Sequence, residues 1–353
     1  MSAFAIYRLP HADHATLIQQ TEGEPAEYHL CSELNGKRGF VVAPFQVTAQ
    51  QPILLIRPDK VEIIEHGTLN IEHGAQESSM FNVQSSMIDS SYAIDFANYH
   101  AQLERNVFRK IVLARCADEE SEEPIDPMEL FRCACMLYPR MFISLVSTPK
   151  GGVWLTATPE ILLEGKDPDW RTIALAGTMK LAGDQLIGEG ETVCWPTKDI
   201  QEQRIVTTYI AECLEQFTGD FHEEGPRTVR AANLVHLRSD FTFTLPDSQH
   251  LGDLLHALHP TPAVCGLPKR ETFNFIIRNE HTPRRYYSGF MGMLDPEGDT
   301  HLYVSLRCMN IEGNHYHLYA GGGLLKDSVK ELEWQETEAK LETMRRCIAI
   351  KKM

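Results

Sequence analysis

The chain has 353 residues, of which 43% are hydrophobic and 23% charged, a composition typical of an ordinary globular protein with room for one or two domains. Its formal net charge of −16 argues against nucleic acids and anionic membranes as partners, because both repel an acidic protein at long range. The nine scattered cysteines indicate reduced thiols, and we expect neither a signal peptide nor a transmembrane helix, so the expected location is the cytoplasm.

The first ninety residues alternate short strand-like runs with polar connections, and none of them carries a motif that suggests chemistry. We expect strands over residues 4–9, 39–45, 52–56 and 61–64. Residues 71–90 are rich in Ser, Gln and Glu and are expected to form a surface loop. This loop leads into a helix predicted over residues 92–109.

The middle of the chain mixes strands with capped helices. Expected strands begin at Lys110 and continue over residues 141–147, 153–158, 161–164, 171–176 and 229–236. Expected helices run from the Asp126-Pro127 cap to about residue 138, over 197–217, from Asp247 or Ser248 to 258, and onward from Pro268. The pair Cys133 and Cys135 falls inside a helical pattern, so we assign it to core packing rather than to a metal.

The last third predicts an antiparallel meander, with strands over residues 286–294, 301–311 and 316–320 joined by two tight turns. Runs of antiparallel strands interspersed with long helices indicate an α+β fold rather than alternating βαβ units. Because no Pro/Gly/Ser-rich linker divides the sequence, we expect a single large domain.

The stretch Tyr319-Ala320-Gly321-Gly322-Gly323 ends the meander and precedes a helix that Asp327 or Ser328 is expected to cap. On that helix Glu333, Glu336 and Lys340 fall at i, i+3 and i+7, which is one face. Glycine amides can approach an anion closely, and this face would add two carboxylates and an ammonium. The alternative is a solvated surface helix that carries an ordinary Glu336 to Lys340 ion pair.

Three further charged residues have two interpretations each. Lys110 precedes an apolar strand, so it is either a desolvated general base or a lysine at a helix C-terminus. Glu160 follows Pro159 at a strand break, so it is either a general acid with a raised pKa or a solvated turn residue. Glu202 is either a ligand to a hard cation, together with Glu333 and Glu336, or a carboxylate that stabilises its helix dipole.

Arg307 is predicted on the middle strand of the meander, where it would pair with a buried carboxylate through a bidentate fork, for structure or for function. His315 and His317 share a strand face, but no third ligand occurs at a standard spacing, so we expect no zinc site. Nothing matches a phosphate-binding loop of the Gly-x4-Gly-Lys-Ser/Thr kind.

From about Lys110 to the C-terminus, these elements together resemble the chorismate-utilising enzymes, most closely the isochorismate synthases. The stretches that carry the resemblance are Arg109-Lys110-Ile111-Val112-Leu113-Ala114-Arg115, Thr158-Pro159-Glu160, Leu175-Ala176-Gly177-Thr178, Lys198-Asp199 with Glu202, His259-Pro260-Thr261-Pro262-Ala263, Tyr287-Ser288-Gly289, Leu306-Arg307-Cys308, the glycine turn, and Glu333-Trp334-Gln335-Glu336-Thr337. The resemblance implies one α+β domain over residues 1–353, with a variable part over 1–90 and the family core over 91–353. Its fold would be two packed antiparallel sheets flanked by helices, with the active site in a cleft between them.

The resemblance also implies roles for individual residues. Lys110 would activate water for attack at C2 of chorismate, and Glu160 would protonate the departing C4 hydroxyl. Glu202 and Glu336 would bind Mg²⁺ directly, and Glu333 through water. Substrate contacts are implied for Gly177, Thr178, His236, Ala263, Arg307, Gly321, Gly322, Gly323 and Lys340.

Two positions distinguish among members of the family. Lysine at position 110 is typical of the members that use water, where the ammonia-using members carry glutamine, and alanine at position 263 replaces the threonine of the ammonia-using and salicylate-forming relatives. The sequence therefore predicts an isochorismate synthase that serves menaquinone or siderophore biosynthesis, with chorismate and Mg²⁺ as its ligands and no obligate protein partner. The alternatives are a salicylate synthase and a catalytically silent chorismate-binding relative. Gln203 departs from the histidine that relatives often carry after the metal-binding glutamate.

Overall fold

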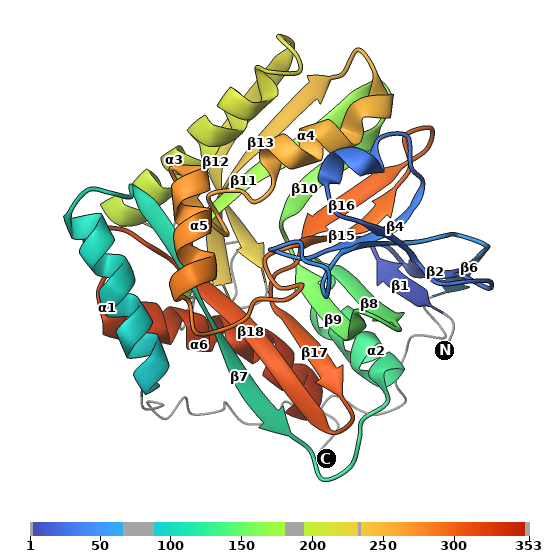
Figure 1. The fold of residues 1–353 in the computed structure, drawn as a ribbon, viewed down its shortest axis with the longest axis horizontal. Helices are drawn as coiled ribbons and strands as arrows, with labels where there is room; N and C mark the ends of the chain where they lie inside the picture. Colours follow the sequence, from blue (N-terminus) through green and yellow to red (C-terminus); the bar gives the residue numbers. More distant parts are fainter. Residues whose placement is uncertain (1–2, 66–87, 181–193, 232–233, 350–353) are drawn as a thin grey trace.

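The strands of the protein form two sheets, each of nine strands, in the part of the chain that the structure describes (Figure 1). The computed structural model describes residues 3–65, 88–180, 194–231 and 234–349. Every pair of neighbouring strands within these residues is antiparallel. None of the helices in the same residues is long and apolar enough to span a membrane.

The first sheet contains strands from the N-terminal part of the chain and from its last third. Its strands, in spatial order, are β14 (Gly266–Leu267), β7 (Lys110–Glu120), β18 (His315–Leu324), β17 (Cys308–Glu312), β9 (Gly152–Thr158), β8 (Phe142–Thr148), β1 (Phe4–Arg8), β2 (His14–Gln19) and β6 (Lys60–Glu65). The long pair β7 and β18 brings Lys110 and residues 321–323 to the same end of the sheet, because Gly323 pairs with Val112 and Gly321 with Ala114. The three glycines therefore belong to β18, and the turn predicted for them is wrong.

The second sheet is built mainly from the middle of the chain. Its strands, in spatial order, are β12 (Phe221–Ala231), β13 (Leu234–Thr244), β11 (Asp169–Lys180), β10 (Ile161–Lys166), β16 (Thr300–Val304), β15 (Phe290–Leu294), β4 (Gly39–Ala43), β5 (Ile53–Ile56) and β3 (Ala26–Tyr28). Strands from residues 1–65 belong to both sheets, so the N-terminal part is integral to the fold.

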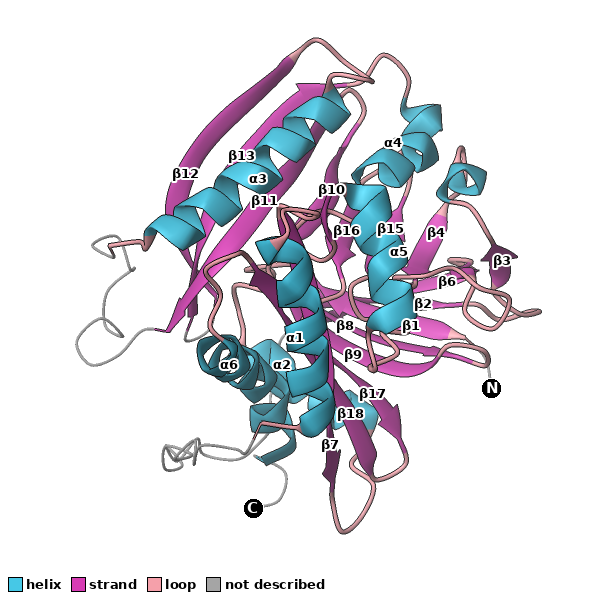
Figure 2. Cartoon of the chain, turned by 60° about the vertical axis from the view of Figure 1, so that its left-hand side comes forward, coloured by secondary structure: helices cyan, strands magenta, loops and turns pink. Residues whose placement is uncertain are grey.

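Helices cover the outer faces of both sheets (Figure 2). Their bounds are α1 (Ser90–Glu104), α2 (Pro127–Leu137), α3 (Thr197–Leu214), α4 (Leu251–Leu258), α5 (Lys269–Asn279) and α6 (Lys330–Ala349). Leu341 of α6 and Leu130 of α2 pack with the first sheet in one apolar cluster, while Ile210 of α3 and Leu255 of α4 pack against the second. The molecule is therefore layered, with helices, sheet, sheet and helices in turn.

A third apolar cluster joins the two sheets to each other. Phe142 of β8 stacks on Tyr303 of β16 with ring centroids 4.3 Å apart, and the rings of Tyr7 of β1 and Phe40 of β4 lie 5.7 Å apart between centroids. Burying such rings contributes roughly 1.5–3 kcal/mol each relative to leaving them exposed. This apolar cluster packs the two sheets against each other. It confirms the predicted α+β fold of a single domain with two packed antiparallel sheets.

Most predicted elements are confirmed, and their caps explain why. The side chain of Asp126 accepts a hydrogen bond from the amide of Met128 and so begins α2 one residue later. The helix expected from Pro268 begins at Lys269 with Pro268 as its N-cap, and the helix expected over 197–217 ends at Leu214. Strands β2 and β3 were not predicted. The loop expected over residues 71–90 lies mostly outside the described residues.

Two predicted strands are wrong because each is really two strands. The single strand expected over residues 301–311 ends at Val304 in the second sheet, and β17 begins at Cys308 in the first. The strand expected over 229–236 is likewise the end of β12 and the start of β13. At the first break Val304, Leu306 and Cys308 alternate with Ser305 and Arg307, so a period-two hydrophobic pattern gives no sign of it.

Candidate active site

A pocket opens between the two sheets, where β7 and β18 of the first approach β11 and β13 of the second. The sequence-predicted residues that line it are Glu160, Gly177, Thr178, Glu202, His236, Ala263, Arg307, Gly321, Gly323, Glu336 and Lys340. Lys110, Gly322 and Glu333 do not line the pocket, although Lys110 pairs with the pocket residue Glu202. Glu333 pairs with Lys198 instead. The predicted residues therefore gather at one place from six different elements and their connecting loops.

Lys110 is the first residue of β7, and its side chain is fully buried. Its Nζ lies 2.8 Å from Oε1 of Glu202, which comes from the second turn of α3. A Cβ atom at Gly323 would lie 2.2 Å from that oxygen and 2.8 Å from Cε of Lys110. Only glycine at position 323 leaves room for this ion pair, which explains why the third of the three consecutive glycines is needed.

Glu160 connects β9 to β10 and is 3% exposed. Its amide hydrogen bonds to Oγ1 of Thr158 at 3.2 Å, and its carbonyl accepts from Val304 at 2.9 Å, so the backbone is fixed on both sides. Burial raises the pKa of its carboxyl to about 8, against the opposing effect of Lys110 and Arg307. At neutral pH the carboxyl is thus largely protonated and able to donate a proton.

Arg307 lies in the connection from β16 to β17, in the left-handed backbone region with φ +47°. Its guanidinium is buried and donates a hydrogen bond to Nε2 of His236. No ion pair joins it to a carboxylate among the described residues, so the predicted pairing with a buried carboxylate side chain of this protein is wrong. A buried guanidinium without a carboxylate partner is suited to bind the carboxylate of a ligand.

His236 links Arg307 to the backbone of β11. Its Nδ1 lies 2.9 Å from the carbonyl oxygen of Gly177, which can only accept, so Nδ1 carries the proton and Nε2 accepts from Arg307. Burial lowers the pKa of this histidine well below its ordinary value, and the charge of Arg307 lowers it further. His236 is therefore a neutral support that fixes the orientation of the guanidinium.

Three acids and three lysines meet around the three consecutive glycines of β18. Lys110 pairs with Glu202, Lys198 pairs with Glu333, and Lys340 lies 2.7 Å from Oε1 of Glu336. Lys340 also donates to the carbonyl oxygen of Gly321 at 2.8 Å, which anchors it to β18. The pocket wall is thus locally neutral in a strongly acidic protein.

The donor set of Glu202, Glu333 and Glu336 suits Mg²⁺, which prefers carboxylate oxygens and few protein ligands. Oε2 of Glu333 is buried and has no hydrogen-bond partner within the described residues, so this oxygen is available to a cation. Burial raises the pKa of Glu333, and the neighbouring Glu336 raises it further. Among the described residues the three acids do not form one group with ligand oxygens within 4.8 Å of one another, and each acid is paired with a lysine. A metal would replace these lysine contacts.

Three residues of the family motifs, to which the resemblance assigns no role, also lie around the site. Asp199 lies in the first turn of α3 beside Gly177, and burial raises the pKa of its carboxyl to about 6, helped by Glu202 and Glu336. Lys198 supplies the counter-charge to Glu333. Tyr287 also lines the pocket, and its hydroxyl would lie 2.7 Å from a Cβ at Gly321. The place of these three residues at the site follows from contacts between segments that are far apart in the sequence, so sequence patterns alone do not indicate it.

Residues 36–349 match the family model described as chorismate binding enzyme. The chain belongs to this family. Its place in the family agrees with the fold, because the chain is similar in structure to the menaquinone-specific isochorismate synthase MenF from Escherichia coli. That likeness has a TM-score of 0.79 and 22% identity, and it covers 98% of this chain and 88% of MenF.

Curated relatives of this member of the family include isochorismate synthases. The chain is 30% identical to isochorismate synthase EntC of Escherichia coli K12 over 238 residues, which are 67% of this chain and 61% of EntC. It is 28% identical to isochorismate synthase DhbC of Bacillus subtilis over 356 residues, which cover 97% of this chain and 89% of DhbC. The matched region thus spans about three fifths of EntC and most of DhbC.

Proposed function

We propose that this chain is a Mg²⁺-dependent isochorismate synthase, which converts chorismate to isochorismate. The reaction adds water at C2 and releases the hydroxyl at C4, so it needs a base near one position and an acid near the other. The observation that carries the proposal is that Lys110 and Glu160 are both buried at this site, with the pKa of Glu160 raised to about 8. Lys110 has the largest charge effect on that carboxyl.

In the proposed reaction Lys110, released from its ion pair with Glu202, takes a proton from the attacking water. Glu160 gives its proton to the departing C4 hydroxyl, which leaves as water, so protons and electron pairs balance across the step. Desolvation keeps Glu160 protonated until it is needed. A lysine at position 110 supports water, rather than ammonia, as the nucleophile.

Substrate binding is assigned to the cationic and backbone groups of the pocket. Chorismate is a dianion, and Arg307 and Lys340 would each bind a carboxylate, with Thr178 and the amides of the three consecutive glycines as further donors. Glu202, Glu336 and Glu333 would hold Mg²⁺, which supplies positive charge to a substrate carboxylate when it is bound. Ala263 lines the pocket without a hydroxyl, which supports release of isochorismate rather than its further conversion.

The test is conversion of chorismate by the wild type, Lys110→Ala and Glu160→Gln, with Mg²⁺ and chromatographic identification of products. We expect isochorismate from the wild type and a loss on the order of 10²–10⁴-fold in both variants, while calorimetry still detects chorismate binding. Lys150→Ala, which removes an exposed lysine, is the matched control and retains full activity. Full activity in either site variant would sink the proposal, and salicylate as the wild-type product would favour a salicylate synthase.

A further inference from the structure

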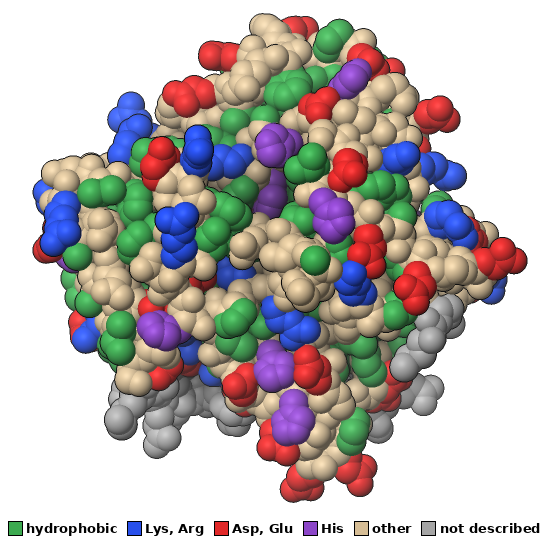
Figure 3. All heavy atoms as spheres, viewed as in Figure 1, with side chains coloured by type: hydrophobic (Ala, Val, Ile, Leu, Met, Phe, Trp, Pro, Cys, Tyr) green, Lys and Arg blue, Asp and Glu red, His purple; other side chains and the backbone are tan. Residues whose placement is uncertain are grey.

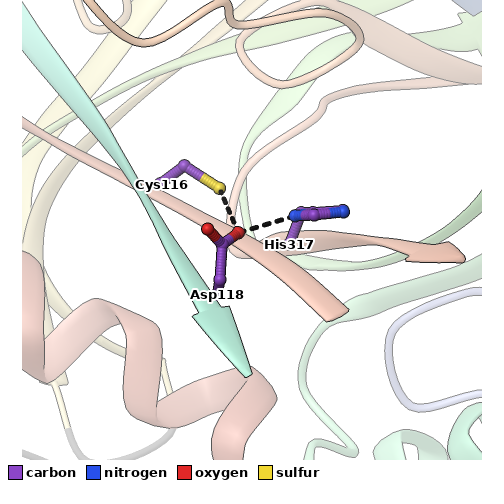
Figure 4. Close-up of side chains that lie close together, drawn as sticks. All are labelled: Cys116, Asp118 and His317. Carbon is purple, nitrogen blue, oxygen red and sulfur yellow. Dashed lines mark hydrogen bonds and ion pairs between the residues drawn. The ribbon is translucent and has the colours of Figure 1, made fainter. Parts of the chain in front are cut away.

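A second cluster of metal-ligating side chains lies outside the pocket, on the strand pair β7 and β18 (Figure 4). Cys116 and Asp118 project from β7, and His317 projects from β18. One ligand atom from each residue lies within 4.8 Å of the other two. The sequence offered no third ligand for His317, because its neighbours here come from a strand about two hundred positions earlier in the chain.

Strand register fixes this grouping. Asp118 pairs directly with His317, and Cys116 pairs with Tyr319 two positions further on, so the three side chains share one face of the sheet. Sγ of Cys116 lies 3.8 Å from Oδ1 of Asp118, and Nδ1 of His317 lies 2.6 Å from the same oxygen. The two backbones hold the donors in place through consecutive ladder pairs.

These distances are close to those of a tetrahedral zinc site. With Zn–N and Zn–O bonds of about 2.0–2.2 Å and a Zn–S bond of about 2.3 Å, neighbouring donors lie about 3.3–3.8 Å apart. The Cys116 to Asp118 separation already fits, and the Asp118 to His317 pair opens by less than about 1 Å through side-chain rotation. A thiolate and an imidazole favour Zn²⁺ or Co²⁺ over Mg²⁺.

The surroundings supply the other parts that such a site needs. Nε2 of His317 lies 3.9 Å from Oε2 of Glu312, which is the side of the ring that a carboxylate orients when Nδ1 binds a metal. The side chains of Asp118 and His317 are 78% and 30% exposed, so the metal and a fourth water ligand reach the site from solvent. Histidine and acidic side chains gather over this end of β7, β17 and β18 in the space-filling view (Figure 3).

We propose that Cys116, Asp118 and His317 form a binding site for Zn²⁺ or a similar borderline transition-metal ion, which clamps β7 to β18. This site is separate from the proposed Mg²⁺ carboxylates, since Cys116 lies six residues, or roughly 20 Å, along β7 from Lys110. Binding displaces the thiol proton of Cys116 to solvent. The bound metal joins β7, which carries Lys110, to β18, which carries the three consecutive glycines.

The test uses the full chain with saturating Mg²⁺, so that the carboxylates of the pocket are occupied, and Co²⁺ as the probe. We expect one equivalent of Co²⁺ to bind with a thiolate-to-cobalt charge-transfer band, and Zn²⁺ to displace it. Cys116→Ser removes the band, and His317→Gln and Asp118→Asn each weaken binding at least about tenfold. Zn²⁺ also raises the melting temperature of the wild type and not that of the variants.

Two further variants serve as controls. Cys194→Ser removes an exposed thiol elsewhere in the chain, and His315→Gln removes the next histidine on the same face of β18; both retain the band and the affinity. Asp118→Asn alters a largely exposed side chain, so it tests the site even where Cys116→Ser is unstable. Absence of the cobalt band in the wild type, its persistence in Cys116→Ser, or unchanged affinity in His317→Gln overturns the proposal.

Discussion

The ammonium of Lys198 donates a hydrogen bond to Oε1 of Glu333, whose side chain is only 2% exposed. Lys198 lies in the first turn of α3 and Glu333 in the first turn of α6, so this contact joins two helices that cover different sheets. Burial opposes the charged form of Lys198, but Glu333, Glu336 and Glu202 outweigh it and raise its pKa. Lys198 therefore competes directly with any cation that binds these acids.

Replacing Lys198 by Met should strengthen Mg²⁺ binding in the absence of substrate. Two unit charges in contact near a protein surface interact by up to about 4 kcal/mol, so we expect a gain of about tenfold or more in affinity. Isothermal titration calorimetry with MgCl₂ measures it. The matched control is Lys150→Met, which breaks the exposed pair with Glu27 and leaves Mg²⁺ affinity unchanged. Weaker Mg²⁺ binding in Lys198→Met would show that the lysine does not compete with the metal.

The site shows which physical information a sequence carries. The face of Glu333, Glu336 and Lys340 follows from helical spacing alone, but spacing left it indistinguishable from a solvated surface helix. What decides between the two is burial, and burial depends on α3, which supplies Lys198 and Glu202 from more than a hundred residues away. Long-range packing of this kind has no local signature, so only the family resemblance indicated it.

For Arg307 the sequence indicated burial correctly but predicted the wrong backbone structure. Its setting between apolar residues correctly indicated burial, but period-two alternation placed it inside a strand, whereas the chain leaves one sheet and enters the other at this point. Residues 305–307 make that crossing, and the left-handed backbone of Arg307 is part of it. Strain at a residue that lines a pocket is typical of functional sites, and no propensity scale predicts it.

Glu160→Gln should remove a specific pH dependence. If Glu160 is the general acid, kcat/KM of the wild type falls as pH rises through about 8, because the carboxyl of the free enzyme loses the proton that it must donate. The variant, which has no proton to lose, shows only its low residual rate without this step. A pH–rate profile of both proteins at chorismate concentrations well below KM, with Mg²⁺ present, provides the measurement. A wild-type profile that stays flat to well above pH 8 contradicts the assignment.

The same carboxyl also links stability to pH. Burial raises its pKa from 4.5 to about 8, so between these values the folded protein holds a proton that the unfolded chain has released. The free energy of unfolding therefore declines as pH rises through this window, by the linkage relation. Urea unfolding of wild type and Glu160→Gln at several pH values isolates the effect, since other buried acids contribute equally to both. A difference between the two proteins that does not change with pH would refute it.

Gly323→Ala should disable the site with a modest effect on folding. The new Cβ would lie 2.2 Å from Oε1 of Glu202 and 2.8 Å from Cε of Lys110, so the ion pair must move. Overpacking costs roughly 1–3 kcal/mol of stability, and a displacement of about 1 Å in a reacting group lowers activity on the order of 10²-fold. Gly219→Ala, whose Cβ meets nothing within 4 Å, is the control in both assays. Normal activity in Gly323→Ala would mean that Lys110 and Glu202 need not be in contact.

Arg307→Lys should weaken substrate binding more than it slows the chemical step. The guanidinium is planar and is held by His236, so it can present a fixed fork to a carboxylate, whereas an ammonium offers a single flexible point charge. We expect KM for chorismate to rise by roughly ten- to a hundredfold, the equivalent of about 1.4–2.7 kcal/mol, with a smaller change in kcat. His236→Gln, which keeps a polar side chain but loses the ring, should raise KM in the same direction by a smaller factor. If Arg307→Lys instead lowers kcat alone, the arginine acts on the transition state rather than on the bound carboxylate.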